Sequence, residues 1–257
     1  MPVPDLDLLT DAARAAGTLA LPFWEGENKV WDKGRDDPVT EADYAVDTLL
    51  RETLTAARPD YGWLSEETED GAARLAQKTL FIVDPIDGTR AFVAGQRTWA
   101  HSLAIVENGQ VTAGVVYLPA LDKLYRAERG GGATLNGAPL TVSDRRDLGG
   151  ASVLASRPAF EPRHWPGGLP KIERHFRPSL AYRLCLVAEG RFDAMLTLRD
   201  SWEWDIAAGG LIAEEAGAKV TDRYGELLNF NNPHPVTKGV LTSTPALHDA
   251  LSAGLNG

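Results

Sequence analysis

Two aspartates three positions apart are the residues best suited to chemistry in this chain. Asp84 and Asp87 occur in Val83-Asp84-Pro85-Ile86-Asp87-Gly88-Thr89, after the apolar residues 79–83, which predict a buried strand. The proline and glycine predict a tight turn at the strand end. Carboxylates gathered there repel each other unless a cation neutralises them, and Mg²⁺ prefers such oxygen ligands. The alternative is an ordinary connection in which the aspartates form a turn and cap a helix.

Three further acidic segments supply candidates for the same site. Asp43 ends Thr40-Glu41-Ala42-Asp43 at the start of a predicted helix, and Glu66 lies in Ser65-Glu66-Glu67-Thr68. Asp205 ends Trp202-Glu203-Trp204-Asp205, just before the helical pattern of residues 206–216. Taken singly, Asp43 or Asp205 would serve equally well as a helix cap, and Glu66 as a solvated loop residue.

Taken together and in this order, the segments resemble the inositol monophosphatase superfamily of metal-dependent phosphomonoesterases. The resemblance rests on the Ser-Glu-Glu, Asp-Pro-Ile-Asp-Gly-Thr and Trp-Asp elements and extends from about Lys33 to the C-terminal strand. It implies an α/β (α+β) fold, a layered αβαβα sandwich of the sugar-phosphatase type. An N-terminal α+β half, residues 1–138, would carry the metal-binding turn, and a C-terminal α/β half, residues 139–257, would close the active site.

The same resemblance implies hydrolysis of a small phosphate monoester by water and two or three bound Mg²⁺ ions. The metal ligands would be Glu66, Asp84, the carbonyl of Ile86, Asp87 and Asp205. The catalytic residues would be Glu66 and Thr89, which orient the attacking water, and Asp43, which supports Thr89 or a further metal. The substrate contacts would be Gly88 and Thr89 through their amides, Arg90, Arg183, and Lys33 from a mobile loop.

The substrate is narrowed by residues around this core. Arg90-Ala91-Phe92 after Thr89 and the Leu-Cys-Leu-Val-Ala-Glu-Gly run after Arg183 resemble the 3′(2′),5′-bisphosphate nucleotidase branch, although a nucleotidase more often has Lys-Glu-Phe at the first place. Arg183 would bind a second phosphate, or else form an ion pair on a helix face. The first expectation is therefore 3′-phosphoadenosine 5′-phosphate, followed by inositol monophosphate and then histidinol phosphate. Inhibition by lithium is a further implication of the resemblance.

Composition constrains the setting of the protein. The 257 residues carry a net charge of −10, with 44% hydrophobic and 24% charged residues, as in ordinary soluble proteins. The charge disfavours binding to nucleic acid polymers or anionic membranes. The single cysteine, Cys185, and the lack of a leader pattern or long apolar run predict a cytoplasmic protein. Homodimers are common in the resembled superfamily and stay an open alternative, as does a non-enzymatic phosphate-sensing module.

Periodicity predicts the elements that position these residues. Helices are expected over residues 7–24, 41–57, 181–189 and 206–216, and strands over residues 79–83, 102–106, 111–117, 123–127, 152–155, 192–198, 219–220 and 240–242. Asn108-Gly109 and Asn136-Gly137 predict hairpin turns. Residues 25–39 are expected to form a mobile loop. The proline-rich, basic residues 157–178 are interpreted as a surface connection, with a lid over the substrate as the alternative.

Overall fold

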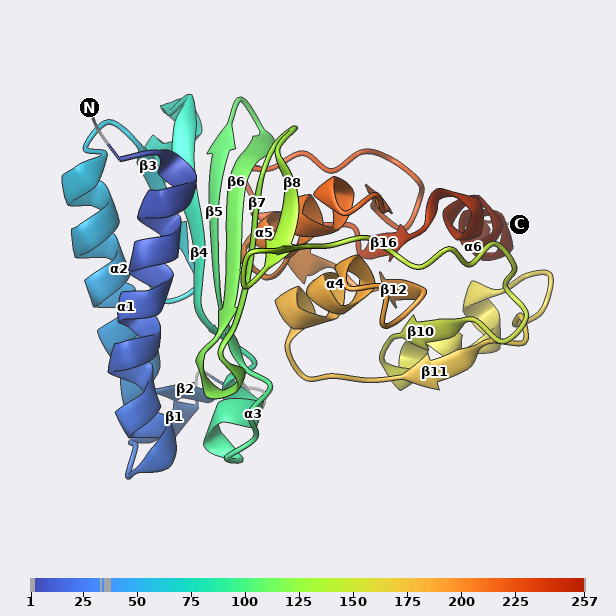
Figure 1. Cartoon of the computed structure of the whole chain (residues 1–257), viewed down its shortest axis with the longest axis horizontal. Helices are drawn as coiled ribbons and strands as arrows, with labels where there is room; N and C mark the ends of the chain where they lie inside the picture. Colours follow the sequence, from blue (N-terminus) through green and yellow to red (C-terminus); the bar gives the residue numbers. More distant parts are fainter. Residues whose placement is uncertain (1–2, 33, 35–37, 257) are drawn as a thin grey trace.

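The computed structural model describes residues 3–32, 34 and 38–256, arranged in layers of helix, sheet, helix, sheet and helix (Figure 1). This confirms the predicted αβαβα sandwich. The large sheet separates α1 and α2 from α4 and α5, and the smaller sheet lies beyond them (Figure 1). The division into two halves at residue 138 stays a prediction. One core cluster joins Leu80 and Ile82 of the large sheet to α4, α5 and the smaller sheet, so the two halves share a core.

The outer helices are α1 (Asp5–Glu25) and α2 (Glu41–Ala57). Leu9, Ala13 and Ala16 recur at helical spacing on α1 and are buried in a cluster shared with α2 and the large sheet. Helix α2 begins with a capping box: the Asp43 N–H donates to the Thr40 hydroxyl, and the Thr40 N–H donates to the Asp43 carboxylate. This cap places Asp43 at a defined point.

The large sheet has the strand order β3-β4-β5-β6-β7-β8-β9. Its strands are β3 (Gly62–Ser65), β4 (Thr79–Asp87), β5 (Ala100–Glu107), β6 (Gln110–Leu118), β7 (Lys123–Glu128), β8 (Gly132–Leu135) and β9 (Ala138–Pro139). β3 pairs with β4 in parallel, and the other neighbours are antiparallel. Asn108 and Gly109, with φ of 51° and 79°, form the predicted turn between β5 and β6.

Side chains alternate between the two faces of this sheet. Phe81 and Val83 of β4 belong to the core under α1 and α2, whereas Leu80 and Ile82 belong to the core shared with α4 and α5. The central helices are α4 (Leu180–Ala188) and α5 (Glu203–Glu215). Cys185 is fully buried within α4, as expected for a structural thiol.

The smaller sheet has the order β11-β10-β12-β16-β14 and is covered by α6 (Pro245–Asn256). Its strands are β10 (Ser152–Leu154), β11 (Glu173–His175), β12 (Ala194–Thr197), β14 (Lys219–Thr221) and β16 (Val240–Ser243). Two short ribbons pair β1 (Val30–Asp32) with β2 (Pro38–Thr40) and β13 (Ser201–Trp202) with β15 (Val236–Thr237). The remaining short helices are α3 (Thr89–Val93), η1 (Ala72–Ala76), η2 (Pro119–Leu121), η3 (Arg157–Phe160) and η4 (Pro162–His164).

The structure corrects several of the predicted elements. Residues 25–39, expected to be a loop, include the β1–β2 ribbon, and the strand predicted to stop at Val83 continues to Asp87. Helix α6 was not predicted. The basic segment 157–178 forms short 3₁₀ turns and β11 at the surface, although Phe176 and Pro178 reach the cavity described below.

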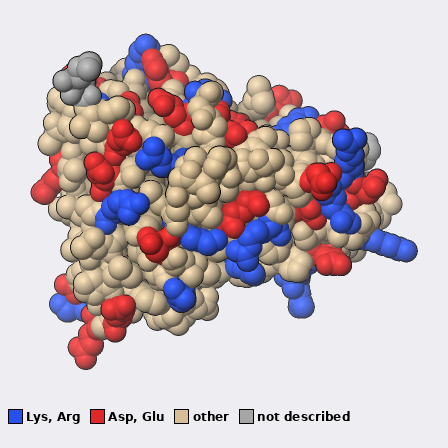
Figure 2. Space-filling view, viewed as in Figure 1, with Lys and Arg blue, Asp and Glu red and all other residues tan. Residues whose placement is uncertain are grey.

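The helices and the surface charges can be compared with the expected lack of binding to membranes and to nucleic acid polymers. No described helix combines the length and apolarity needed to cross a lipid bilayer. On the face shown in Figure 2, basic and acidic side chains are interspersed. Whether the protein avoids nucleic acid polymers stays a prediction.

Candidate active site

Three carboxylates from distant parts of the chain meet between the large sheet and α5. Oxygens of Asp84 and Asp87 on β4 and of Asp205 in the first turn of α5 lie within 4.8 Å of one another. They line a cavity of about 870 Å³. The same cavity is lined by the other residues expected to bind metal or substrate that the structure describes, namely Glu66, Ile86, Gly88, Thr89, Arg90 and Arg183.

A β-bulge explains how both aspartates of β4 reach one cavity. Residues three apart on a regular strand face opposite sides. Asp84 pairs with Ser102 and Asp87 pairs with Ala100. Between these two pairs β4 has two residues and β5 has one, which defines a β-bulge. The tight turn predicted at the strand end is therefore wrong at Pro85, which lies within β4, whereas Gly88 does form a turn with a φ of 97°. Proline is tolerated here because a bulge residue leaves the ladder and needs no N–H.

Asp84 is buried without a hydrogen-bond donor. Its side chain is 1% exposed, and neither carboxylate oxygen accepts a hydrogen bond from a described N–H or hydroxyl group. Burial and repulsion by Glu66, Asp87 and Asp205 raise the pKa of Asp84 well above its ordinary value. Burial, followed by repulsion from Asp87, raises the pKa of Asp205 to about 7. The positive charges of Arg199 and Arg183 oppose the rise at Asp205 only in part, and this set of oxygen donors suits a hard divalent cation.

Asp87 differs from Asp84 because helix α4 receives its carboxylate. The Ser179 hydroxyl and the Ala181 N–H donate to one oxygen at 2.6 Å each, and the Leu180 N–H donates to the other at 3.2 Å. Burial raises the pKa of Asp87, while these hydrogen bonds oppose the rise. The start of α4 thus fixes the orientation of Asp87.

Asp43 and Thr89 are brought together behind the acidic cluster. The Thr89 hydroxyl lies 3.3 Å from one oxygen of Asp43 and 3.1 Å from the Ile86 carbonyl oxygen. The other oxygen of Asp43 accepts the Thr40 N–H at 2.8 Å. Helix capping and the contact to Thr89 therefore use different oxygens of the same carboxylate. Asp43 can cap α2 and support Thr89 at the same time.

Glu66 follows β3 and is placed next to β4 by the parallel pairing. Its N–H donates to the Val83 carbonyl oxygen at 3.2 Å, directly beside Asp84 in the chain. Its side chain is half-buried and lines the cavity. The two strands therefore deliver Glu66 and Asp84 to the same end of the sheet.

The three basic residues expected to contact the substrate differ in position. Arg183 lines the cavity, lies over the Phe176 ring at 4.4 Å and donates to the carbonyls of Arg177 and Pro178. These carbonyls and this ring hold the Arg183 side chain, and its binding to a second phosphate stays a prediction. Burial lowers the pKa of Arg183 to about 10, so it remains charged at neutral pH. Arg90 is exposed at the rim, and Lys33 lies outside the described residues.

Several residues of the cavity were missed by the sequence analysis. Arg199 lines it, and its positive charge opposes the rise in the pKa of Asp205. Trp202 and Trp204 stack at 4.7 Å with an interplanar angle of 8°, and Trp202 is 39% exposed. Ser179 was identifiable as the cap of the predicted helix, but no local pattern marks Arg199.

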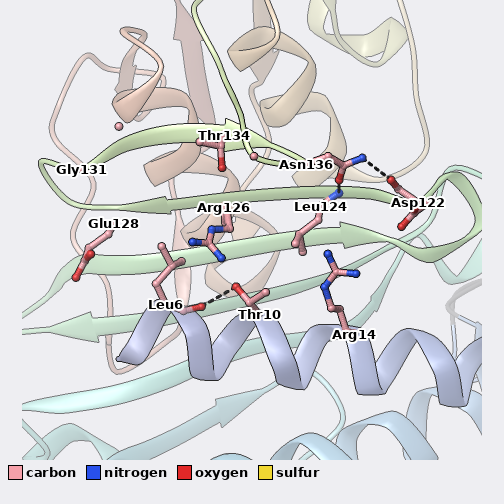
Figure 3. A pocket seen from close by; sticks show the side chains of 12 residues that line it. Leu6, Thr10, Arg14, Asp122, Leu124, Arg126, Glu128, Gly131, Thr134 and Asn136 are labelled. Carbon is pink, nitrogen blue, oxygen red and sulfur yellow. Dashed lines mark hydrogen bonds between the residues drawn. The ribbon is translucent and has the colours of Figure 1, made fainter. Parts of the chain in front are cut away.

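A second cavity, of about 640 Å³, lies between α1 and strands β7 and β8 (Figure 3). Arg14 and Arg126 line it together with Asp122 and Glu128, so charges of both signs are present. Arg126 also lies 3.5 Å from Asp7. Among the described residues, the cluster suited to a metal lies in the first cavity and not in this one.

Comparison with known proteins agrees with the site. The model of the inositol monophosphatase family matches residues 4–256. An inositol-1-monophosphatase of Rhizobium meliloti (strain 1021) is 40% identical over 237 residues, which cover 86% of each chain. A histidinol-phosphatase of Chlorobaculum parvum (strain DSM 263 / NCIMB 8327) is 34% identical over 228 residues, 86% of this chain and 87% of its own. A solved IMPase from Thermotoga maritima has a TM-score of 0.83 at 33% identity, covering 98% and 96% of the two chains.

The chain belongs to the inositol monophosphatase family. It is a phosphatase that acts on small phosphorylated substrates, which confirms the predicted family and enzyme class. The named relatives support the inositol alternative better than the preferred bisphosphate nucleotidase.

Proposed function

We propose that the protein is a Mg²⁺-dependent phosphomonoesterase that hydrolyses inositol monophosphate by direct attack of water. The observation that carries the metal requirement is the cluster of Asp84, Asp87 and Asp205, in which Asp84 is buried with no described hydrogen-bond donor. The substrate is supported by the relative that is 40% identical and named an inositol-1-monophosphatase.

Five groups would hold the metal: the carboxylates of Glu66, Asp84, Asp87 and Asp205 and the carbonyl of Ile86. All are oxygen donors, as Mg²⁺ requires, and two or three ions would share them. Bound Mg²⁺ supplies charge for the phosphate oxygens and the leaving group and acidifies a bound water.

The residues behind the cluster would orient the attacking water. Because the Thr89 hydroxyl lies beside both Asp43 and the Ile86 carbonyl, it donates its proton to one of them and keeps a lone pair for a water hydrogen. Glu66 would accept the second hydrogen from the opposite side. Amides at Gly88 and Thr89 would receive phosphate oxygens; α3 spans only five residues, so its dipole adds little.

A bisphosphate nucleotide such as 3′-phosphoadenosine 5′-phosphate is the second candidate substrate. Besides Arg90 at the rim, the guanidinium groups of Arg183 and Arg199 line the cavity and would suit a second phosphate. The exposed, stacked Trp202 offers a flat apolar surface for a base. Histidinol phosphate is the third candidate, supported by the relative that is 34% identical.

A phosphate-release panel in Mg²⁺ tests the proposal. Inositol 1-phosphate, 3′-phosphoadenosine 5′-phosphate, histidinol phosphate and fructose 1,6-bisphosphate are compared by kcat/KM. We expect inositol 1-phosphate to rank first. Replacing Arg199 by Gln should lower turnover of the nucleotide more than that of inositol 1-phosphate. A higher kcat/KM for the nucleotide would reverse the order of the candidates, and no hydrolysis with intact Mg²⁺ binding would favour the phosphate-sensing alternative.

Other expectations from the sequence belong to the same proposal and await measurement. These are the number of Mg²⁺ ions, inhibition by lithium and a cytoplasmic location, with a homodimer as an open alternative.

A further inference from the structure

The bulge in β4 places two residues opposite one. Pro85 and Ile86 lie between Asp84 and Asp87, which pair with Ser102 and Ala100, so the single residue His101 of β5 faces both. If β4 paired regularly with β5 and kept three positions between the aspartates, Asp87 would face α1 and α2, as Phe81 and Val83 do. The bulge therefore decides whether the two carboxylates share a cavity.

Backbone carbonyls that leave the ladder at a bulge need other donors, because a buried carbonyl without one is costly. The Ile86 carbonyl lies 3.1 Å from the Thr89 hydroxyl. The Pro85 carbonyl is contacted by Nδ1 of the His101 side chain. Each of the two carbonyls of the bulge thus has its own side-chain partner, Thr89 for Ile86 and His101 for Pro85.

His101 reaches Pro85 from behind the acidic cluster. Its side chain is fully buried, and its ring lies 5.5 Å from Trp99 and 6.5 Å from Tyr117, which belong to the core under α1 and α2. A carbonyl can only accept, so Nδ1 carries the proton. Burial lowers the pKa of His101 to about 4, which agrees with a neutral ring and a single N–H. His101 lies on the wrong face of the sheet to touch the metal or the substrate.

We propose that His101 is a positioning residue whose Nδ1–H holds the Pro85 carbonyl and so keeps Asp84 and Asp87 on one face of the sheet. This inference rests on the proposed function, because it assigns His101 an effect on Mg²⁺ affinity. The effect passes through the backbone of the bulge and requires no contact between His101 and the ion.

Three substitutions separate the hydrogen bond from packing. His101→Asn places an amide N–H where Nδ1 lies, His101→Gln places it nearer the position of Nε2, and His101→Leu retains bulk without a donor. Trp99→Phe is the matched control, since it alters the same aromatic cluster and leaves His101 in place. Mg²⁺ affinity is measured by calorimetry and thermal stability by unfolding, independently of turnover.

We expect His101→Leu and His101→Gln to weaken Mg²⁺ binding about 10- to 100-fold, the usual effect of removing a group that orients a ligand. His101→Asn should recover most of the affinity, and Trp99→Phe should lower stability with Mg²⁺ affinity retained. If His101→Leu does not fold, the difference between the Asn and Gln variants still supports the assignment.

Unchanged Mg²⁺ affinity in His101→Leu would overturn the role of His101 and leave the proposed function standing. Equal losses in Trp99→Phe and His101→Leu would assign the effect to packing and also overturn it. Failure of the unaltered protein to bind Mg²⁺ would overturn the proposed function, and this inference with it.

Discussion

The cavity beside α5 and the cavity beside α1 both contain charged residues, but their charges are satisfied differently. In the first cavity, the carboxylates of Asp84, Asp87 and Asp205 lie within 4.8 Å of one another, and Asp84 is buried without a described donor although arginines line the same cavity. In the second cavity, Arg14 and Arg126 lie with Asp122 and Glu128, and Arg126 is near Asp7 (Figure 3). A fold can tolerate unbalanced buried charge where a ligand neutralises it, so the first arrangement indicates function and the second indicates an ordinary polar surface.

Replacing Asp84 by Asn should have the largest effect on kcat/KM and should distinguish the two cavities most clearly. Loss of one charged ligand should lower kcat/KM at least about 100-fold, on the scale of a lost electrostatic contact. The metal-free protein should become more stable, because a repelled buried charge is removed. Steady-state kinetics and unfolding in a chelator measure both. Glu128→Gln in the second cavity is the control, and equal loss in that variant would end the contrast.

Addition of Mg²⁺ should stabilise the protein through the first cavity alone. At a concentration 100 times the dissociation constant, the free energy of unfolding should rise by about 2.7 kcal/mol. Thermal unfolding with and without Mg²⁺ measures the shift. Arg126→Gln should retain the shift and Asp84→Asn should lose most of it. A shift that survives in Asp84→Asn would place the metal elsewhere.

Acid should destabilise the fold through His248, which lies in neither cavity. His248 is 1% exposed, its Nε2 lies 2.9 Å from the Thr221 hydroxyl, and its charged neighbours are Lys219 and Asp249. Burial lowers its pKa to about 4, so the folded protein binds fewer protons than the unfolded chain. Neutral His248 should contribute on the order of 1–3 kcal/mol to the free energy of unfolding. This contribution should be present in full above pH 6.5 and be lost as the pH falls towards 4.

The control for that prediction is His248→Gln, whose amide can still reach Thr221 but does not titrate. Its stability should fall less between pH 6.5 and 4 in chemical unfolding. Identical slopes for the two proteins would contradict the assignment. The comparison also separates the pH dependence of the fold from that of the acidic cluster.

The smallest effect is expected from the second cavity. Arg126→Gln removes a half-exposed partner of Asp7 and should change the free energy of unfolding by at most about 1 kcal/mol, with kcat/KM unchanged. Denaturant unfolding and the phosphate-release assay test this. A large loss of turnover would show that the balanced charges of this cavity do serve the reaction.

The sequence determined the family, the main helices and strands, and which acids are candidates for the site. These depend on local periods and on short motifs, such as the Asn-Gly turn before β6 and the cap before α2, which are set by neighbouring residues. The relatives then changed only the order of the candidate substrates.

How the acids combine depends on contacts between distant segments of the chain. The bulge depends on pairing with β5 at Ser102 and Ala100, and the hydrogen bonds to Asp87 depend on where α4 packs. His101 lies in an apolar strand and carries no motif, yet its contact with Pro85 joins residues on adjacent strands. Such contacts arise from the register between segments distant in the chain, because a shift of one residue changes the face that each side chain occupies.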